Sequence, residues 1–294
     1  MPETTDFKRI VLADWVNLAR FNTLGGFKVA YWTAGKGEPL VLIHGFPASS
    51  WDWSKLWWPL AQSYRLIAMD LLGFGLSDKP WPHRYTIGEQ AELILALLEA
   101  QGIDRFHVLA HDYGDTVTQE LLARDLQGGE RRIRSVALLN GGLFPEAHKP
   151  LFVQKLMASP LGPVTSRLMS RSAFGRNMTR IFGVDNPPDG IELDGFWHLI
   201  ERGQGVRVMP GLIRYMAERE QNRSRWVGGL EGAICPLRFI DGVDDPISGE
   251  EMAKRYEAVV PNPDVLRIPG CGHYPQLEKP AEVFAAYQSF RKSQ

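Results

Sequence analysis

Val108-Leu109-Ala110-His111-Asp112-Tyr113-Gly114-Asp115 is the most informative stretch of this 294-residue sequence. Its apolar beginning predicts the end of a buried strand, and the residues from Asp115 to Arg124 predict a helix. Between them, Ala110 and Gly114 take the two small positions of a nucleophile elbow, G-x-S-x-G, in which a sharp strand-to-helix turn exposes a reactive side chain. Asp112 occupies the position that this pattern gives to serine.

The carboxylate of Asp112 suits a different chemistry from that of a serine hydroxyl. A carboxylate that attacks an ester forms an anhydride, which has no advantage over the starting material. A carboxylate that attacks an sp3 carbon forms an alkyl-enzyme ester, which water can then cleave. A helix N-cap also favours aspartate, but capping does not explain the flanking small residues or the motifs downstream. Asp112 therefore indicates cleavage of a carbon–oxygen or carbon–halogen bond.

Short apolar runs alternate with helical patterns along most of the chain. The predicted strands are 27–32, 39–44, 64–69, 106–110, 133–139, 236–240 and 264–268, and the predicted helices are 87–99, 115–124, 249–259 and 281–291. A further strand, Ile10–Leu18, is predicted to pair with the first of these through a turn at Gly25-Gly26. The alternation predicts an α/β fold, with a mostly parallel sheet and helices on both faces.

The pattern changes between residues 145 and 226. Here Pro and Gly interrupt helical patterns, and no buried strand is evident. We therefore expect a helical insertion, a cap or lid, over residues 145–226. The core domain is expected to consist of residues 1–144 and 227–294.

Three further motifs follow predicted strands, at the edge of the sheet where an open α/β fold places its chemistry. They are His44-Gly45-Phe46-Pro47, Gly242-Val243-Asp244-Asp245-Pro246 and Gly272-His273-Tyr274-Pro275. The backbone amides of Phe46 and Tyr113 can form an oxyanion hole beside the elbow. The G-x-x-D spacing favours Asp245 over Asp244 as the acid. His273 follows it, which gives the chain order nucleophile, acid, histidine.

The composition excludes several classes of protein. Lys and Arg total 33 against 34 Asp and Glu, so the net charge of −1 gives no argument for nucleic acid or an anionic membrane as a partner. Cys235 and Cys271 offer neither a disulfide framework nor metal-ligand spacing. No apolar run approaches the roughly 18 residues of a membrane span, and Met1–Arg9 lacks a signal-peptide pattern. We expect a cytoplasmic enzyme without cofactor or metal; its oligomeric state is not specified.

Together the motifs resemble the α/β-hydrolases of the epoxide hydrolase and haloalkane dehalogenase branch. Within that branch the chain is most similar to the mesoderm-specific-transcript-like epoxide hydrolases. The resemblance spans nearly the whole chain and is carried by HGFP (44–47), DLLGFGLSDKP (70–80), HDYGD (111–115), NGGLFPE (140–146), RWVGGL (225–230), DGVDDP (241–246) and HYPQLEKP (273–280).

This resemblance implies a two-step reaction that converts a small hydrophobic epoxide and water into a vicinal diol. Asp112 is the implied nucleophile. His273, oriented by Asp245, is the implied base for the water that cleaves the ester. The oxyanion hole of Phe46 and Tyr113 would then serve the enzyme's own carboxyl group.

Opening an epoxide also requires an acid, because the leaving alkoxide is strongly basic. The family supplies cap tyrosines, often two, whereas the insertion of this chain contains one, Tyr215. Its place late in the insertion matches the second family tyrosine, and Trp197 or His198 is the alternative donor. His44 and Trp51 are further pocket candidates, although His44 is more readily explained as a structural hydrogen-bonding residue.

Two other functions are compatible with the triad. A haloalkane dehalogenase would use the same three residues, but that branch usually carries Trp directly after the nucleophile, where this chain has Tyr113. Fluoroacetate dehalogenases place Arg there, which this chain lacks as well. The alternative of another class is a binding protein that has kept the fold without turnover, and the complete triad argues against it.

Overall fold

An eight-stranded sheet forms the centre of the computed structural model, which describes residues 5–294. Residues 1–4 lie outside the described residues. They are part of the stretch Met1–Arg9, in which the sequence shows no signal-peptide pattern. The strand order is β1-β2-β4-β3-β5-β6-β7-β8. β2 pairs antiparallel with β1 and β4, and every other neighbouring pair is parallel, which confirms the predicted mostly parallel sheet. The strands are β1 (Arg20–Leu24), β2 (Phe27–Ala34), β3 (Glu38–Ile43), β4 (Tyr64–Met69), β5 (Phe106–His111), β6 (Ile133–Leu139), β7 (Leu237–Gly242) and β8 (Val265–Ile268).

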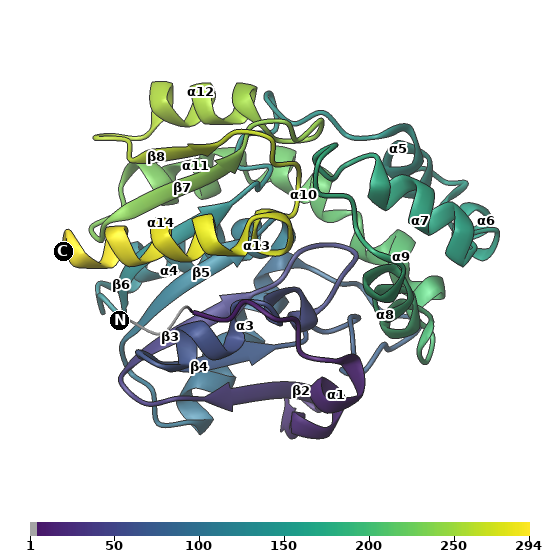
Figure 1. Ribbon diagram of the computed structural model, residues 1–294, viewed down its shortest axis with the longest axis horizontal. Helices are drawn as coiled ribbons and strands as arrows, with labels where there is room; N and C mark the ends of the chain where they lie inside the picture. Colours follow the sequence, from purple (N-terminus) through teal and green to yellow (C-terminus); the bar gives the residue numbers. More distant parts are fainter. Residues whose placement is uncertain (1–4) are drawn as a thin grey trace.

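Helices cover both faces of this sheet, as predicted. In Figure 1, α14 crosses in front of the strands, while α3 and α4 lie behind them. The helices of the core are α2 (Trp57–Ala61), α3 (Ile87–Ala100), α4 (Tyr113–Gly128), α11 (Arg223–Glu231), α12 (Glu250–Val259), α13 (Pro275–Glu278) and α14 (Pro280–Lys292), with the short 3-10 helix η1 (Ser50–Trp53) after β3.

The middle of the sheet positions the site. All six residues of β5 are buried, and the strand lies between β3 and β6. Because these strands are parallel, their carboxyl ends meet at one edge of the sheet. The segments after β3, β5, β6 and β7 therefore come together there, although they are far apart in the sequence.

One predicted strand is wrong. Residues 12–18 form the helix α1 (Leu12–Leu18), so the hairpin through glycines 25 and 26 joins β1 and β2 instead. The apolar residues Leu12, Trp15 and Val16 recur at helical spacing, and only Trp15 is fully buried. Its indole stacks on that of Trp32, with ring centroids 5.0 Å apart. One such anchor holds a short helix on the edge of the sheet, whereas a strand there would require alternate buried residues.

The chain between β6 and β7 is helical. It forms α5 (Phe152–Ala158), α6 (Gly162–Arg167), α7 (Arg171–Thr179), α8 (Gly190–Glu201), α9 (Gly205–Leu212) and α10 (Tyr215–Gln221), and then α11. Figure 1 shows α5 to α9 gathered at one end of the molecule, beyond the strands.

α11 spans residue 226, the predicted end of the insertion, and packs against the core helix α4. Arg225 and Trp226 both donate hydrogen bonds to the carboxylate of Glu120 on α4. Across residues 5–294, none of the helices is long and apolar enough to cross a membrane.

Candidate active site

Asp112 lies in the sharp turn between β5 and α4. Its backbone has φ 47° and ψ −103°, a strained conformation for a residue other than glycine. Gly114 permits this turn, because a Cβ there would overlap the carbonyl oxygen of Ile43. The Asp112 side chain makes no capping hydrogen bond to α4, so N-capping does not explain its position at the start of this helix.

The two carboxylate oxygens of Asp112 face different partners. Oδ2 accepts a hydrogen bond of 3.0 Å from the backbone amide of Phe46, in the loop after β3. Gly45 lets this loop approach, since a Cβ there would lie 2.6 Å from Nδ1 of His111. Tyr113 begins α4 directly after Asp112, although no hydrogen bond joins its amide to the carboxylate among the described residues. The Phe46 amide thus occupies the place expected of an oxyanion-hole donor.

Oδ1 of Asp112 faces the hydroxyl of Tyr215, the first residue of α10, at 3.4 Å. The Tyr215 side chain is buried and packs against the ring of Tyr113, with centroids 4.7 Å apart. Burial and the nearby Asp112 charge raise the pKa of Tyr215. The phenol therefore holds its proton beside the carboxylate, as a general acid must.

His273 and Asp245 form a buried pair. Nδ1 of His273 lies 2.7 Å from Oδ2 of Asp245. Burial disfavours the charged imidazole, but Asp245 and, to a lesser degree, Asp112 raise the pKa of His273 to about 9. Burial likewise opposes the Asp245 charge, and His273 with the surrounding donors nevertheless lowers the pKa of that carboxyl. The pair can orient the ring and stabilise an imidazolium.

Two polar residues that sequence reasoning missed hold Asp245 in place. Asn140, after β6, donates from Nδ2 to Asp245 Oδ2 at 3.1 Å. The hydroxyl of Ser248 donates to the same oxygen at 2.8 Å. Asn140 has a positive φ of 45°, and its location directly after a buried strand, before Gly141-Gly142, was the available signal.

The loop that carries His273 is fixed by buried polar groups. One oxygen of Glu278 accepts hydrogen bonds from the amides of Gly183 and Gly272, and the other accepts one from the amide of Tyr274, at 2.8 to 2.9 Å. His111 Nε2 lies 2.7 Å from the carbonyl oxygen of His273. These contacts leave the His273 ring little freedom to turn away from Asp245.

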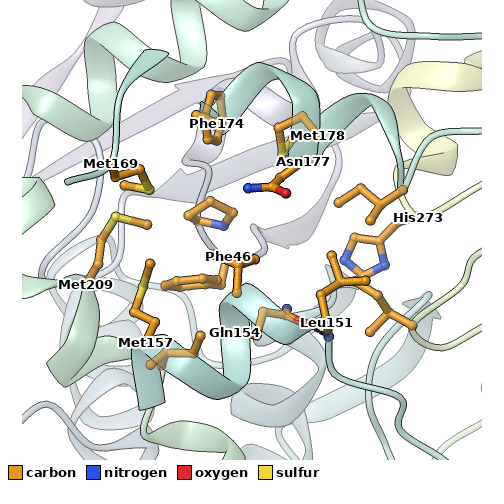
Figure 2. Close-up of a pocket in the computed structure, with 15 residues that line it drawn as sticks. Phe46, Leu151, Gln154, Met157, Met169, Phe174, Asn177, Met178, Met209 and His273 are labelled. Atoms are coloured by element: carbon orange, nitrogen blue, oxygen red, sulfur yellow. Dashed lines mark hydrogen bonds between the residues drawn. The ribbon is translucent and has the colours of Figure 1, made fainter. Parts of the chain in front are cut away.

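An apolar pocket of about 560 Å³, part of it open to solvent, lies between His273 and the helices of the insertion. Phe46 and His273 belong to its wall, and Figure 2 shows Met157, Met169 and Met209 on the side opposite His273. Asn177 on α7 presents a polar amide to the same space. Such a lining suits an apolar molecule, and methionines adapt to irregular shapes.

The remaining predicted pocket residues are dispersed. His44 is fully buried, with Nε2 accepting from the Leu71 amide at 3.0 Å and Nδ1 2.9 Å from the Gly45 carbonyl, so both ring nitrogens serve the backbone. Burial lowers the pKa of His44, which keeps the ring neutral.

Trp51 is buried and donates from its indole to the Ile10 carbonyl at 2.9 Å. Trp197 is half-buried on α8 beside Phe174, a pocket residue, with ring centroids 5.8 Å apart. His198 is exposed on the same helix. The structure therefore does not bring His198 to Asp112, because the helix turns it toward solvent. No group of three or more His, Cys, Asp or Glu within residues 5–294 is arranged to hold a metal ion.

Comparisons with known proteins agree with this fold. A family model described as "alpha/beta hydrolase fold" matches residues 38–178. The chain is 42% identical to the mesoderm-specific transcript homolog protein of Bos taurus, over 96% of this chain and 88% of that protein. It is 25% identical to haloalkane dehalogenase 2 of Mycobacterium tuberculosis, over 88% of this chain and 90% of that protein.

The solved structure of the epoxide hydrolase CorEH superposes with a TM-score of 0.79. The two share 19% sequence identity, with 92% of this chain and 97% of that chain covered. This likeness concerns the fold alone. It confirms the expected mostly parallel sheet with flanking helices as an α/β-hydrolase fold.

Proposed function

The chain belongs to the α/β-hydrolase family, and on that premise we propose that it hydrolyses an epoxide to a vicinal diol through a covalent ester on Asp112. One observation carries the proposal. The carboxylate of Asp112 has one oxygen held by the Phe46 amide at 3.0 Å and the other beside the Tyr215 hydroxyl at 3.4 Å. A nucleophile and a proton donor thus face the same point, which is what opening a strained C–O bond requires.

In the first half-reaction, Oδ1 of Asp112 attacks an epoxide carbon and the carbon–oxygen bond of the ring breaks. The departing oxygen takes the proton of the Tyr215 hydroxyl, which leaves a phenolate. Oδ2 becomes the carbonyl oxygen of the new ester and keeps its hydrogen bond from the Phe46 amide. This amide is then ready to stabilise the negative charge that develops when water attacks the ester.

The second half-reaction depends on His273. Water attacks Cγ of the Asp112 ester and gives one proton to His273. The bond between Cγ and the ester oxygen then breaks, the departing alkoxide takes the second proton of that water, and the diol leaves while His273 still carries the first proton. The proton is finally returned to the Tyr215 phenolate, so the enzyme is regenerated. Formation of the ester also neutralises Asp112, which removes one of the charges that raise the pKa of His273. We expect the pKa of the imidazole to fall at this point, so a larger fraction of the ring is neutral and able to act as the base.

The helical insertion acts in this proposal as the cap that binds the substrate. Residues of α5, α7 and α9 line the apolar pocket, and Tyr215 on α10 supplies the acid. The apolar lining of this pocket suits a hydrophobic substrate.

Single turnover in 18O-labelled water tests the covalent step. With enzyme in excess over an aryl epoxide, we expect the label in the carboxylate of Asp112 and an unlabelled diol. Peptide mass spectrometry of the 105–124 region locates the label. If all of the label enters the diol in the first turnover, water attacks the epoxide directly and the proposal is wrong.

A haloalkane dehalogenase is the second candidate, because a relative with that name covers most of the chain. The halide that leaves in a dehalogenase reaction would need indole or amide hydrogen-bond donors near Asp112. Tyr113 follows the nucleophile, and the Trp51 indole is bound to the Ile10 carbonyl. Turnover of bromoalkanes exceeding that of styrene-type and aliphatic epoxides would favour this candidate. If neither bromoalkanes nor styrene-type nor aliphatic epoxides form an ester on Asp112, a binding protein is favoured instead.

A further inference from the structure

Arg219 is a buried cation whose role no motif explains. It lies on α10, one turn after Tyr215, and its side chain is 2% exposed. Nε and both terminal nitrogens have no hydrogen-bond partner among the described residues. A charge in this setting costs several kcal/mol unless other groups stabilise it. The surroundings of the guanidinium group therefore indicate what it does.

Two elements besides α10 face this guanidinium. α4 contributes Asp115, which is fully buried, and the loop after β6 contributes His148, whose Nε2 is buried and unpaired within the described part of the chain. The same loop contributes Gly142, where a Cβ would overlap one of the terminal nitrogens of Arg219. Burial and the Asp112 charge raise the pKa of Asp115, and burial followed by the charge of Arg219 lowers that of His148 to about 3. Neither group forms a hydrogen bond with the guanidinium among the described residues, so neither is a direct hydrogen-bonding partner of the arginine.

Tyr215 is the remaining neighbour, and it lies between two charges. The guanidinium carbon of Arg219 is 4.8 Å from the centroid of the Tyr215 ring, while the Tyr215 hydroxyl is 3.4 Å from Asp112 Oδ1. The rings of Tyr113 and Phe46 cover other sides of the phenol and carry no charge. When Asp112 becomes an ester and the phenol loses its proton, the positive charge of Arg219 lies against the ring of the phenolate. In a water-excluded site that attraction is strong.

We propose that Arg219 is a positioning residue for the acid: it holds the Tyr215 ring and stabilises the phenolate formed when the proton passes to the leaving oxygen. This inference rests on the proposed function. It gives a role to a buried cation whose side chain makes no hydrogen bond within residues 5–294. It also explains how a single cap tyrosine can protonate a strongly basic alkoxide.

A double-mutant cycle tests the coupling. The rate of ester formation on Asp112 is measured with styrene oxide by rapid quenching and intact-protein mass spectrometry, in the wild type, Arg219→Met, Tyr215→Phe and the double variant. We expect Arg219→Met to slow ester formation by about 30-fold, as a desolvated cation–π contact would. Tyr215→Phe should slow it by about 100-fold or more. The double variant should be no slower than Tyr215→Phe alone.

The second step distinguishes this role from a merely structural one. Hydrolysis of the preformed ester, which does not use the phenol as an acid, should change less than about twofold in Arg219→Met. Arg219→Lys keeps the charge but not the planar group, and should recover part of the loss. Additive effects in the cycle, or equal slowing of both steps, would overturn the inference.

Gly142→Ala provides an independent perturbation. It tests the coupling between Arg219 and Tyr215 even if Arg219→Met does not fold. The new methyl group displaces the guanidinium from its place without removing a charge. Slower ester formation, which disappears in a Tyr215→Phe background, supports the coupling; an unchanged rate contradicts it. If the wild type forms no ester with the epoxide, the proposed function fails and the inference fails with it. If the wild type forms the ester but the cycle is additive, the inference alone fails.

Discussion

Asp245→Asn should separate the two half-reactions of the proposed mechanism. Asp245 is 7% exposed and accepts the 2.7 Å hydrogen bond of His273 Nδ1. It does not touch the epoxide in the proposed reaction, so ester formation on Asp112 should continue. Hydrolysis of that ester should slow sharply, because the base would lose both its orientation and the charge that stabilises its protonated form.

The expected size follows from the pair itself. The pKa of His273 is about 9 against an ordinary value of 6.5, so its surroundings favour the imidazolium by roughly 3 kcal/mol. Losing the larger part of this stabilisation from the transition state for ester hydrolysis slows it by about 100-fold. An amide in place of the carboxylate also permits the wrong tautomer of the ring, which extends the loss toward about 10⁴-fold.

Rapid-quench mass spectrometry measures both steps. In Asp245→Asn the intact protein should accumulate the mass of enzyme plus epoxide, whereas the wild type should show little of this adduct. Asp244→Asn is the matched control, because Asp244 is the exposed neighbour and should behave like the wild type. The reasoning is refuted if Asp245→Asn hydrolyses its ester at the normal rate, or if it loses ester formation as severely as hydrolysis.

Three further predictions concern stability, measured by urea unfolding. Because the pKa of His273 is raised to about 9, its charge stabilises the fold fully below about pH 6.5, and this contribution is lost as the pH rises through 9. In His273→Gln, the free energy of unfolding should therefore decrease less between pH 6.5 and pH 9 than in the wild type. Glu278→Ala removes the acceptor of three buried backbone amides and should cost about 3 kcal/mol, while the exposed Glu282→Ala should cost less than about 0.5; equal losses would contradict the role of Glu278. Gly114→Ala forces a methyl group onto a backbone carbonyl and should cost more than about 2 kcal/mol, whereas Gly190→Ala, with nothing within 4 Å, should be neutral or stabilising; a stable Gly114→Ala would disprove the steric argument.

Much of the core could be predicted because its signals are local. The apolar run of β5 and the turn residues around Asp112 lie within a few positions of one another. The exception is α1, where a single buried tryptophan anchors a helix in a segment predicted to be a strand. Short apolar segments carry too few residues for their period to be unambiguous.

The support of the site was harder to predict. Asn140 and Ser248 hold Asp245. Asn140 begins the motif NGGLFPE (140–146), but nothing in that motif indicates a contact with Asp245, and Ser248 lies outside the quoted motifs. Arg219 was the least predictable, because a charged residue on an amphipathic helix is usually exposed. Its burial depends on the space left by a glycine 77 positions earlier in the chain, at residue 142.

The sequence by itself determined which residues are candidates for the triad and their order, since each motif follows its own strand and is written in consecutive residues. Only the tertiary structure decided their convergence: parallel strands bring Asp112 and His273 to one edge of the sheet, and α10 places Tyr215 over them. The physical reason is the separation along the chain over which each interaction acts. Hydrophobic periodicity and turn chemistry act between near neighbours, whereas burial, charge and hydrogen bonding at the site arise between segments that are up to 228 residues apart.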